Sequence, residues 1–250
     1  MKKLLLPLAA LAACFVAGCS KAPVAKADYV IATDTVFRPF EFDNEQGEFV
    51  GIDLDILAAV AKDQGFTYDL QRIGWDAAIA ACQAGQADGM IAGASITDER
   101  KATGWIFSDG YFNATQSLAV KADSDIQSLA DLKGKNVAVK NGTSGEKHAN
   151  ALKDQYGFTV TVFEDSPTMY QDVLQGNSAA CAEDTPIMAD NIKSGKAAMR
   201  ILEDSTSAPA PYGFAVFNAS KQPLIDKFNA GLKNIQASGE YQAILDKYLK

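Results

Sequence analysis

The sequence predicts an α/β protein with two similar lobes, each a sheet covered by helices. Strand patterns alternate with helix patterns along most of the chain, which is typical of parallel α/β sheets. The order helix, glycine, short turn and buried strand occurs twice, in AIAACQAGQADGMIAG and again in DVLQGNSAACAED. A last strand pattern, YGFAVFN, follows Pro209 and Pro211, where the chain would return to the first lobe.

The first lobe begins with the strand pattern YVIAT at 29–33. The helix pattern GIDLDILAAVAKDQG follows, with Leu54, Leu57 and Ala61 at helical spacing and Gly65 as its C-terminal stop. The strand FTYDLQRI, the helix WDAAIAACQAG and the buried strand ADGMIAG come next. These patterns predict a sheet whose strands are connected by helices.

The second lobe repeats this order. It begins with the strand NVAVK, a helix to about Tyr156 and the strand FTVTVFE. A helix to Gly176, the strand SAACAE and a helix from Thr185 follow. Two C-terminal helices, 223–238 and 240–249, come after the last strand of the chain.

The first nineteen residues are typical of a targeting segment. Lys2 and Lys3 precede the apolar stretch 4–18, which is too short to span a bilayer comfortably. The stretch ends in small residues and a cysteine, and two such endings exist, LAAC at Cys14 and VAGC at Cys19. We prefer Cys19 as the lipidated residue of a lipoprotein signal, because the polar sequence Ser-Lys-Ala-Pro follows it. The alternative is an ordinary secretory signal with an incidental cysteine. We therefore predict a signal peptide over 1–19 and a tether over 20–27.

Charge and cysteine content exclude several classes of function. The formal net charge of −8 argues against nucleic acid as a partner, because phosphate binding needs a basic surface. Beyond the targeting segment only Cys82 and Cys181 remain, too far apart in sequence for a disulfide framework. Both lie in apolar patterns, so we expect buried free thiols. No spacing typical of a metal site or cofactor motif is present, and we expect neither group.

Six motifs give the chain a family resemblance. In order they are ATDTVFRPFEF, GIDLDILAAVA, ITDERKATGWIFSDGYF, DLKGKNVAVKNGTS, EDTP and PYGFAVF. Together they resemble the polar amino-acid-binding proteins of bacterial ABC importers (solute-binding protein family 3), and most of all the glutamine-binding members. The resemblance covers Asp28 to Lys250. It implies the type II periplasmic-binding-protein fold, with a ligand cleft between two lobes joined by two crossover strands.

The same resemblance locates the crossovers and the lobes. It implies crossover strands near 111–114 and 208–212, and the two prolines of the second suit a linker. We therefore predict that lobe 1 comprises 28–112 and 211–250, and that lobe 2 comprises 113–210.

The ITDER motif supplies a candidate cation for the ligand's α-carboxylate. A guanidinium gives a carboxylate two parallel charged hydrogen bonds, and the resemblance gives this role to Arg100. An isolated arginine is more often a solvated surface charge. Here, however, it follows a buried strand that ends at Gly93, with Ser95 beside it. From the second lobe, the NGTSG loop offers Thr143, with Ser144 as a weaker candidate.

The EDTP motif supplies a candidate partner for the ligand's α-ammonium. The resemblance gives this role to Asp184. A capping role for Asp184 at the helix that starts at Thr185 is the alternative reading. Glu183 stands where the glutamine-binding members tend to carry histidine, so the identity of the ligand stays open.

Four further residues complete the predicted pocket. In register with the family, Phe37 and Trp75 would flank the aliphatic part of the ligand, although such aromatic residues are usually core. Asp34, Lys140 and Glu183 would face its side chain with one excess negative charge. A neutral amide can bridge such groups and a cation can offset the charge, whereas an acidic side chain is disfavoured. We therefore expect a glutamine-like amino acid first and a basic one next.

The expected function is capture of an amino acid by hinge closure and delivery to an ABC permease. We expect a monomer in the cell envelope, in the periplasm or on the outer face of the membrane, lipid-anchored through Cys19. One alternative is an enzyme on this fold, a dehydratase of an amino-acid-like cyclic acid, and another is a ligand-binding surface adhesin or sensor. We expect no enzyme, because His148 is the only histidine and no nucleophile is paired with a base. We expect His148 itself to be exposed.

Overall fold

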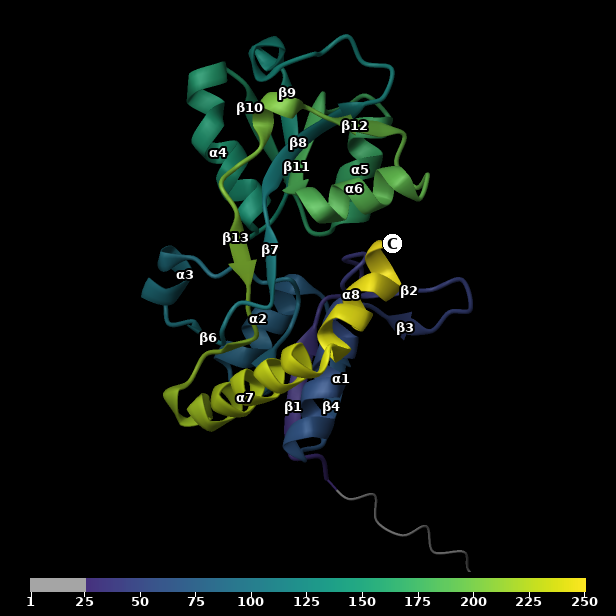
Figure 1. Cartoon of the computed structure of the whole chain (residues 1–250). Helices are drawn as coiled ribbons and strands as arrows, with labels where there is room; N and C mark the ends of the chain where they lie inside the picture. The colour runs from purple at the N-terminus through teal and green to yellow at the C-terminus, as the bar shows by residue number, and fades with distance from the viewer. Residues whose placement is uncertain (1–25) are drawn as a thin grey trace, which may run out of the picture.

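The computed structural model describes residues 26–250. The predicted signal segment, with Cys14 and Cys19, lies outside the described residues. Figure 1 shows two lobes, one above the other, each with its own sheet. This is the predicted two-lobe α/β fold.

The sheet of lobe 1 is mixed. Its strand order is β4 (Tyr68–Arg72), β1 (Tyr29–Thr33), β5 (Gly89–Met90), β14 (Ala215–Val216) and β6 (Ile106–Phe107). β1 runs parallel to β4 and β5, whereas β14 runs antiparallel to β5 and β6. The parallel pairing that the strand–helix alternation predicts is present among β1, β4 and β5, and β14, which the chain reaches from the other lobe, adds an antiparallel strand.

Five helices and a short hairpin complete lobe 1. The helices are α1 (Ile52–Gln64), α2 (Trp75–Gln83), α3 (Asp98–Ala102), α7 (Gln222–Ser238) and α8 (Glu240–Leu249). A 3-10 turn, η3 (Ala219–Lys221), precedes α7, and the hairpin consists of β2 (Phe42–Asp43) and β3 (Phe49–Val50). α1 packs against α7, and their apolar faces bury Leu57, Val60, Phe228 and Leu232 in one core.

Lobe 2 has the same layered construction. Its strand order is β10 (Thr159–Phe163), β9 (Asn136–Lys140), β11 (Ala180–Asp184), β8 (Gln116–Lys121) and β12 (Met199–Ile201). The first three are parallel and β8 is antiparallel to both of its neighbours. The helices are α4 (Ser144–Tyr156), α5 (Ser166–Leu174) and α6 (Thr185–Lys193), with 3-10 turns η1 (Leu129–Leu132) and η2 (Glu203–Ser205).

Two extended segments connect the lobes. β7 (Phe112–Ala114) and β13 (Ala210–Tyr212) form an antiparallel pair in which Phe112 faces Tyr212. Figure 1 shows the pair running side by side between the two sheets. The lobe boundaries proposed from the sequence, after residues 112 and 210, fall inside this pair.

Some elements differ from their predicted extent. The strands β8 and β12 are not among the predicted elements, and β5 covers only two residues of the predicted 87–93. Strand β5 stops early because the backbone turns at Gly93, whose φ of 56° suits glycine. Cys82 and Cys181 are free and buried, as predicted. Among residues 26–250 no helix has the length and apolar character needed to cross a membrane.

Candidate ligand-binding site

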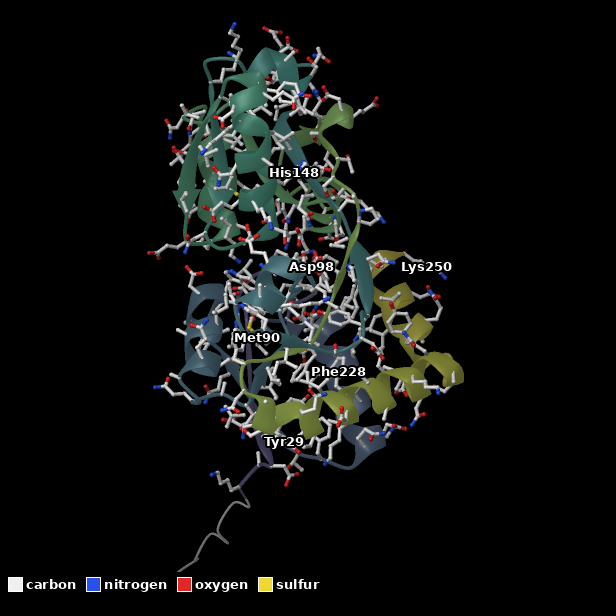
Figure 2. All side chains as sticks on the ribbon, turned by 90° about the vertical axis from the view of Figure 1, so that its left-hand side faces the viewer. Tyr29, Met90, Asp98, His148, Phe228 and Lys250 are labelled. Carbon is white, nitrogen blue, oxygen red and sulfur yellow. The ribbon has the colours of Figure 1, made fainter. Side chains whose placement is uncertain are left out.

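The eleven predicted ligand-binding residues meet around one cavity between the lobes. Its enclosed free volume is small, about 20 Å³, which is little more than one water molecule needs. Figure 2 shows side chains of both lobes approaching each other near the level of Asp98. Ala92 also lines the cavity, and the predicted residues around it are Asp34, Phe37, Trp75, Gly93, Ser95, Arg100, Lys140, Thr143, Ser144, Glu183 and Asp184.

Arg100 is held in place by its own helix and by both lobes. Thr97 caps α3, and its hydroxyl accepts a hydrogen bond from the Arg100 N–H at 3.2 Å. The guanidinium donates to the carbonyl oxygen of Ser95 at 2.9 Å and, across the cleft, to that of Gly142 at 3.2 Å. Burial lowers the pKa of Arg100 to about 10, so the group is still charged at neutral pH. Two of its five N–H donors serve these carbonyls, and the others can serve a carboxylate.

Asp184 is a buried carboxylate with both oxygens engaged. Gln116 Nε2 donates to Oδ1 at 2.8 Å, and the Tyr212 hydroxyl donates to Oδ2. Asp184 precedes α6, but within the described residues its side chain makes no capping hydrogen bond. The capping alternative is therefore wrong for the carboxylate. Burial raises the pKa of Asp184, and the donated hydrogen bonds and the charge of Arg100 oppose this rise.

Asp34 and Lys140 form an ion pair across the cleft. Asp34 follows β1 in lobe 1 and Lys140 ends β9 in lobe 2, and the carboxylate bonds directly to Nζ. Their residues are only 4% and 2% exposed. Burial lowers the pKa of Lys140, but Asp34 and then Glu183 outweigh it, so the pKa lies above its ordinary value. The ion pair is internally neutral, which leaves Glu183 as the group that sets the charge of this end of the cavity.

Glu183 is buried beside Asp184 and bonded to its own lobe. Its Oε2 accepts from Ser166 Oγ at 2.5 Å and its Oε1 from the Asp184 N–H at 3.1 Å. Burial, and then the charge of Asp184, raise the pKa of Glu183 to about 7. At neutral pH this group therefore occurs both as an acid, which can donate, and as a carboxylate.

The N-terminus of α4 forms part of the wall near Arg100. The Thr143 hydroxyl accepts from the Glu146 N–H at 3.2 Å and donates to the Lys140 carbonyl at 2.7 Å. This hydroxyl is thus engaged in capping α4, which the sequence did not predict. The positive end of the helix at Ser144 still favours an anion in the cavity.

Aromatic rings and a glycine shape the apolar part of the cavity. Phe37 and Trp75 line it from lobe 1, and the Arg100 guanidinium carbon lies 5.0 Å from the Trp75 ring centroid. A Cβ atom at Gly93 would lie 2.5 Å from the Phe37 ring, so a larger residue would displace this wall. Trp75 Nε1 is buried and has no partner among the described residues.

A second carboxyl pair lies behind the Gly93 wall, and sequence reasoning missed it. Asp53 Oδ2 accepts a hydrogen bond from the Gly93 N–H at 2.8 Å. Glu41 is fully buried, and neither of its oxygens has a partner in the described part of the chain. Burial and the charge of Asp53 raise the pKa of Glu41 well above its usual range, and burial raises that of Asp53 to about 7. The sequence did hold one sign of this pair. Asp53 lies four residues before the core residue Leu57, so it is on the same, buried face of the helix.

One surface prediction is wrong. His148 was expected to be exposed, but it is partly buried, and its Nε2 lies 2.6 Å from the Ser205 carbonyl oxygen. That prediction treated the helix in isolation, whereas a distant segment of the chain packs against it. The exposed carboxylate of Glu99 pairs with Lys147 of lobe 2.

Sequence comparison places the chain in a family. The profile of the bacterial extracellular solute-binding proteins, family 3, matches residues 29–250. The chain belongs to this family. It is 30% identical over 228 residues to an arginine-binding periplasmic protein of Mannheimia haemolytica, covering 90% of this chain and 92% of that protein.

Two solved structures show the family's fold. An ancestral arginine-binding protein bound to glutamine is 34% identical, with a TM-score of 0.79 over 88% of this chain and 97% of that one. Substrate-binding domain 2 of Lactococcus lactis GlnP, in an open conformation, is 41% identical, with a TM-score of 0.62 over 91% and 97%. Because family 3 proteins are solute-binding proteins, the prediction that this one is not an enzyme is confirmed.

Proposed function

We propose that this family 3 protein binds one free polar amino acid in the cavity between its lobes. Arg100, with the α4 N-terminus at Thr143 and Ser144, holds the α-carboxylate, and Asp184 holds the α-ammonium. The observation that carries the proposal is that a fixed guanidinium of lobe 1 and a fixed carboxylate of lobe 2 line the same small cavity. An α-amino acid presents the matching charges on one carbon atom.

Glu183 favours a neutral amide or a cation at the other end of the ligand. The Asp34–Lys140 pair is already neutral, so an acidic side chain would meet no free cation there and would face Glu183. A glutamine amide can donate to Glu183 or Asp34 and accept from Lys140. We therefore keep a glutamine-like ligand first and basic amino acids second. A relative named for arginine and an ancestral arginine-binding protein bound to glutamine support both classes.

We further propose that the lobes close over the ligand by bending at β7 and β13. Cross-cleft bonds support this, among them Arg100 to the Gly142 carbonyl and Asn141 Nδ2 to Asp76 at 2.7 Å. The TM-scores support it too, because the ligand-bound ancestral protein matches better than the more similar but open GlnP domain. The closed, loaded form would then be recognised by an ABC permease.

A thermal-shift screen over the twenty amino acids tests the ligand. At 1 mM, a ligand with a dissociation constant of about 1 μM stabilises the native state by about 4 kcal/mol, which raises Tm by roughly 8 °C or more. We expect the largest shift with glutamine, followed by arginine, lysine and histidine, and none with glutamate. A protein freed of ligand that responds to no amino acid would refute the proposed function.

The thermal shift given by arginine should also depend on pH. Between pH 6 and pH 8 it should grow relative to the shift given by glutamine, because Glu183 ionises over this range.

We also propose that a lipid on Cys19 holds the protein at the membrane surface. The support is the VAGC sequence after a short apolar stretch, followed by a polar tether. Intact-mass and peptide spectra of the mature protein should show an N-terminal cysteine that carries acyl chains. A mature N-terminus beginning at an unmodified alanine or serine would contradict lipidation and leave the amino-acid proposal standing.

A further inference from the structure

The carboxylate of Asp184 is held by two side chains that belong to the connection between the lobes. Gln116 begins β8, directly after β7, and Tyr212 ends β13. Each donates a hydrogen bond to a different oxygen of Asp184. Both donors are buried, and Tyr212 is 0% exposed. Neither residue was among the predicted ligand-binding residues, and neither lines the cavity.

Tyr212 is fixed on the lobe 1 side of this contact. Its backbone forms an antiparallel bridge with Ser95, and its carbonyl accepts from the Tyr111 N–H at 2.8 Å. Its ring meets Phe40 edge to face at 5.1 Å and stacks on Phe112 at 5.8 Å between centroids. The hydroxyl therefore reaches Asp184 of lobe 2 from a ring that the core of lobe 1 holds rigidly.

Gln116 is fixed by the segment that leads into β13. Ser207 Oγ accepts from the Gln116 N–H at 2.9 Å, and its single proton is within reach of both Gln116 Oε1 at 3.0 Å and the Ala208 carbonyl at 2.8 Å. Because the Asp184 carboxylate only accepts, the amide nitrogen of Gln116 is the atom directed to Oδ1. Both donors of Asp184 are thus held by the connection between the lobes.

We propose that Tyr212 and Gln116 are positioning residues that hold Asp184 ionised and oriented toward the ligand's ammonium. This inference rests on the proposed function, in which Asp184 binds that ammonium. A carboxylate without donors at this depth would take up a proton, and a protonated Asp184 would lose its attraction for a cation. Burial raises the pKa of Asp184, and the bonds from Tyr212 and Gln116 are the two largest effects that lower it.

Other titratable groups around Asp184 must be separated from this effect. They are Arg100 from α3, Lys140 from β9, Tyr170 from α5 and Glu183 on the same strand. Only Glu183 has a pKa of about 7, so its titration overlaps the range of interest. Measuring each variant also in a Glu183→Gln background removes this overlap.

The test is Tyr212→Phe, which removes the hydroxyl and keeps the packed ring. Affinities for L-glutamine and L-arginine are measured by calorimetry from pH 4.5 to pH 8. We expect binding at pH 7 to weaken by about tenfold to a hundredfold, the effect of losing a hydrogen bond to a charged group. We also expect a change in the acid limb of the affinity profile, the low-pH range in which affinity falls as Asp184 takes up a proton. This limb should move to higher pH, because Asp184 loses a donor that stabilises its ionised form. Gln116→Met should move the limb in the same direction.

A matched control is Tyr241→Phe, since the Tyr241 hydroxyl donates to the backbone carbonyl of Tyr111 away from the cavity. This variant should keep wild-type affinity and an unmoved acid limb. If Asp184→Asn abolishes binding while Tyr212→Phe and Gln116→Met keep the wild-type profile, the positioning role is refuted and the proposed function stands. If the two variants bind more weakly but their acid limbs do not move, the role in holding Asp184 ionised is also refuted. If Asp184→Asn binds normally, the assignment of Asp184 fails, and this inference fails with it.

Discussion

Arg100→Ala is expected to remove most of the amino-acid binding that calorimetry measures at neutral pH. The variant leaves the ligand's α-carboxylate in a small cavity without its fixed cation. Removing one partner of a desolvated charge pair costs about 2–5 kcal/mol. Since each 1.4 kcal/mol is a factor of ten, affinity should fall by roughly 30-fold to several thousandfold. Arg100→Lys keeps the positive charge but cannot form two parallel hydrogen bonds to the carboxylate, so it should bind the ligand with intermediate affinity.

The matched control is Arg72→Ala. Arg72 also combines an ion pair with an aromatic contact, to Asp43 and to the Phe49 ring, but it lies in lobe 1 outside the cavity. It should bind normally. Arg100 also bonds to Ser95 and packs near Trp75 and Trp105, so the melting temperature of the ligand-free variant must be recorded. A folded Arg100→Ala protein with near wild-type affinity would refute the assignment of the carboxylate site.

Asp184→Asn is expected to remove most binding for the complementary reason. The substitution keeps size and shape but removes the negative charge that faces the ligand's ammonium. The unpaired ammonium should again cost about 2–5 kcal/mol, measured by calorimetry at neutral pH. Unlike Arg100→Ala, this variant also lowers the net negative charge of a crowded acidic cluster, so its ligand-free form should fold well.

Asp204→Asn is the control for this prediction. Asp204 is a lobe 2 carboxylate that accepts a backbone hydrogen bond from Leu129 at 3.0 Å, outside the cavity. Its loss should leave ligand affinity unchanged. Normal affinity in Asp184→Asn, together with normal affinity in the control, would mean that another group binds the ammonium.

The candidate site could be predicted from sequence because its residues lie where elements end. Asp34 follows β1, Lys140 ends β9 and Asp184 ends β11, and the carboxyl ends of parallel strands share one edge of a sheet. The family motifs then added Arg100 and Trp75. By residue type alone, an arginine is equally compatible with a solvated surface position and a tryptophan with a core position. All eleven predicted residues line one cavity for this reason.

The residues that support the site could not be predicted in the same way. Gln116 and Tyr212 reach Asp184 from positions 68 and 28 residues away, through contacts that only the folded topology creates. Glu41 and Asp53 are charged residues in apolar patterns, and local sequence gives no sign that they face each other. The strand β8 was missed because it is buried along nearly its whole length and lacks the alternation of a half-exposed strand.

The ion pairs between the lobes also could not be predicted from the sequence. Glu99 with Lys147, and Arg38 with Asp190 at 2.6 Å, join helices or loops that are solvated surfaces when each lobe is considered alone. Their pairing depends on the angle between the lobes, which the periodicity of either lobe does not encode. These pairs are consistent with a fold whose two halves approach each other over a ligand.

The central claim is that the cavity recognises both charged groups of a free amino acid. Calorimetric titration of ligand-free wild-type protein with L-glutamine, its α-methyl ester and its N-acetyl derivative tests this most directly. We expect tight binding of glutamine, at roughly micromolar or below, and no detectable binding of either derivative. Equal affinity for the ester, the N-acetyl form and the free amino acid would contradict it.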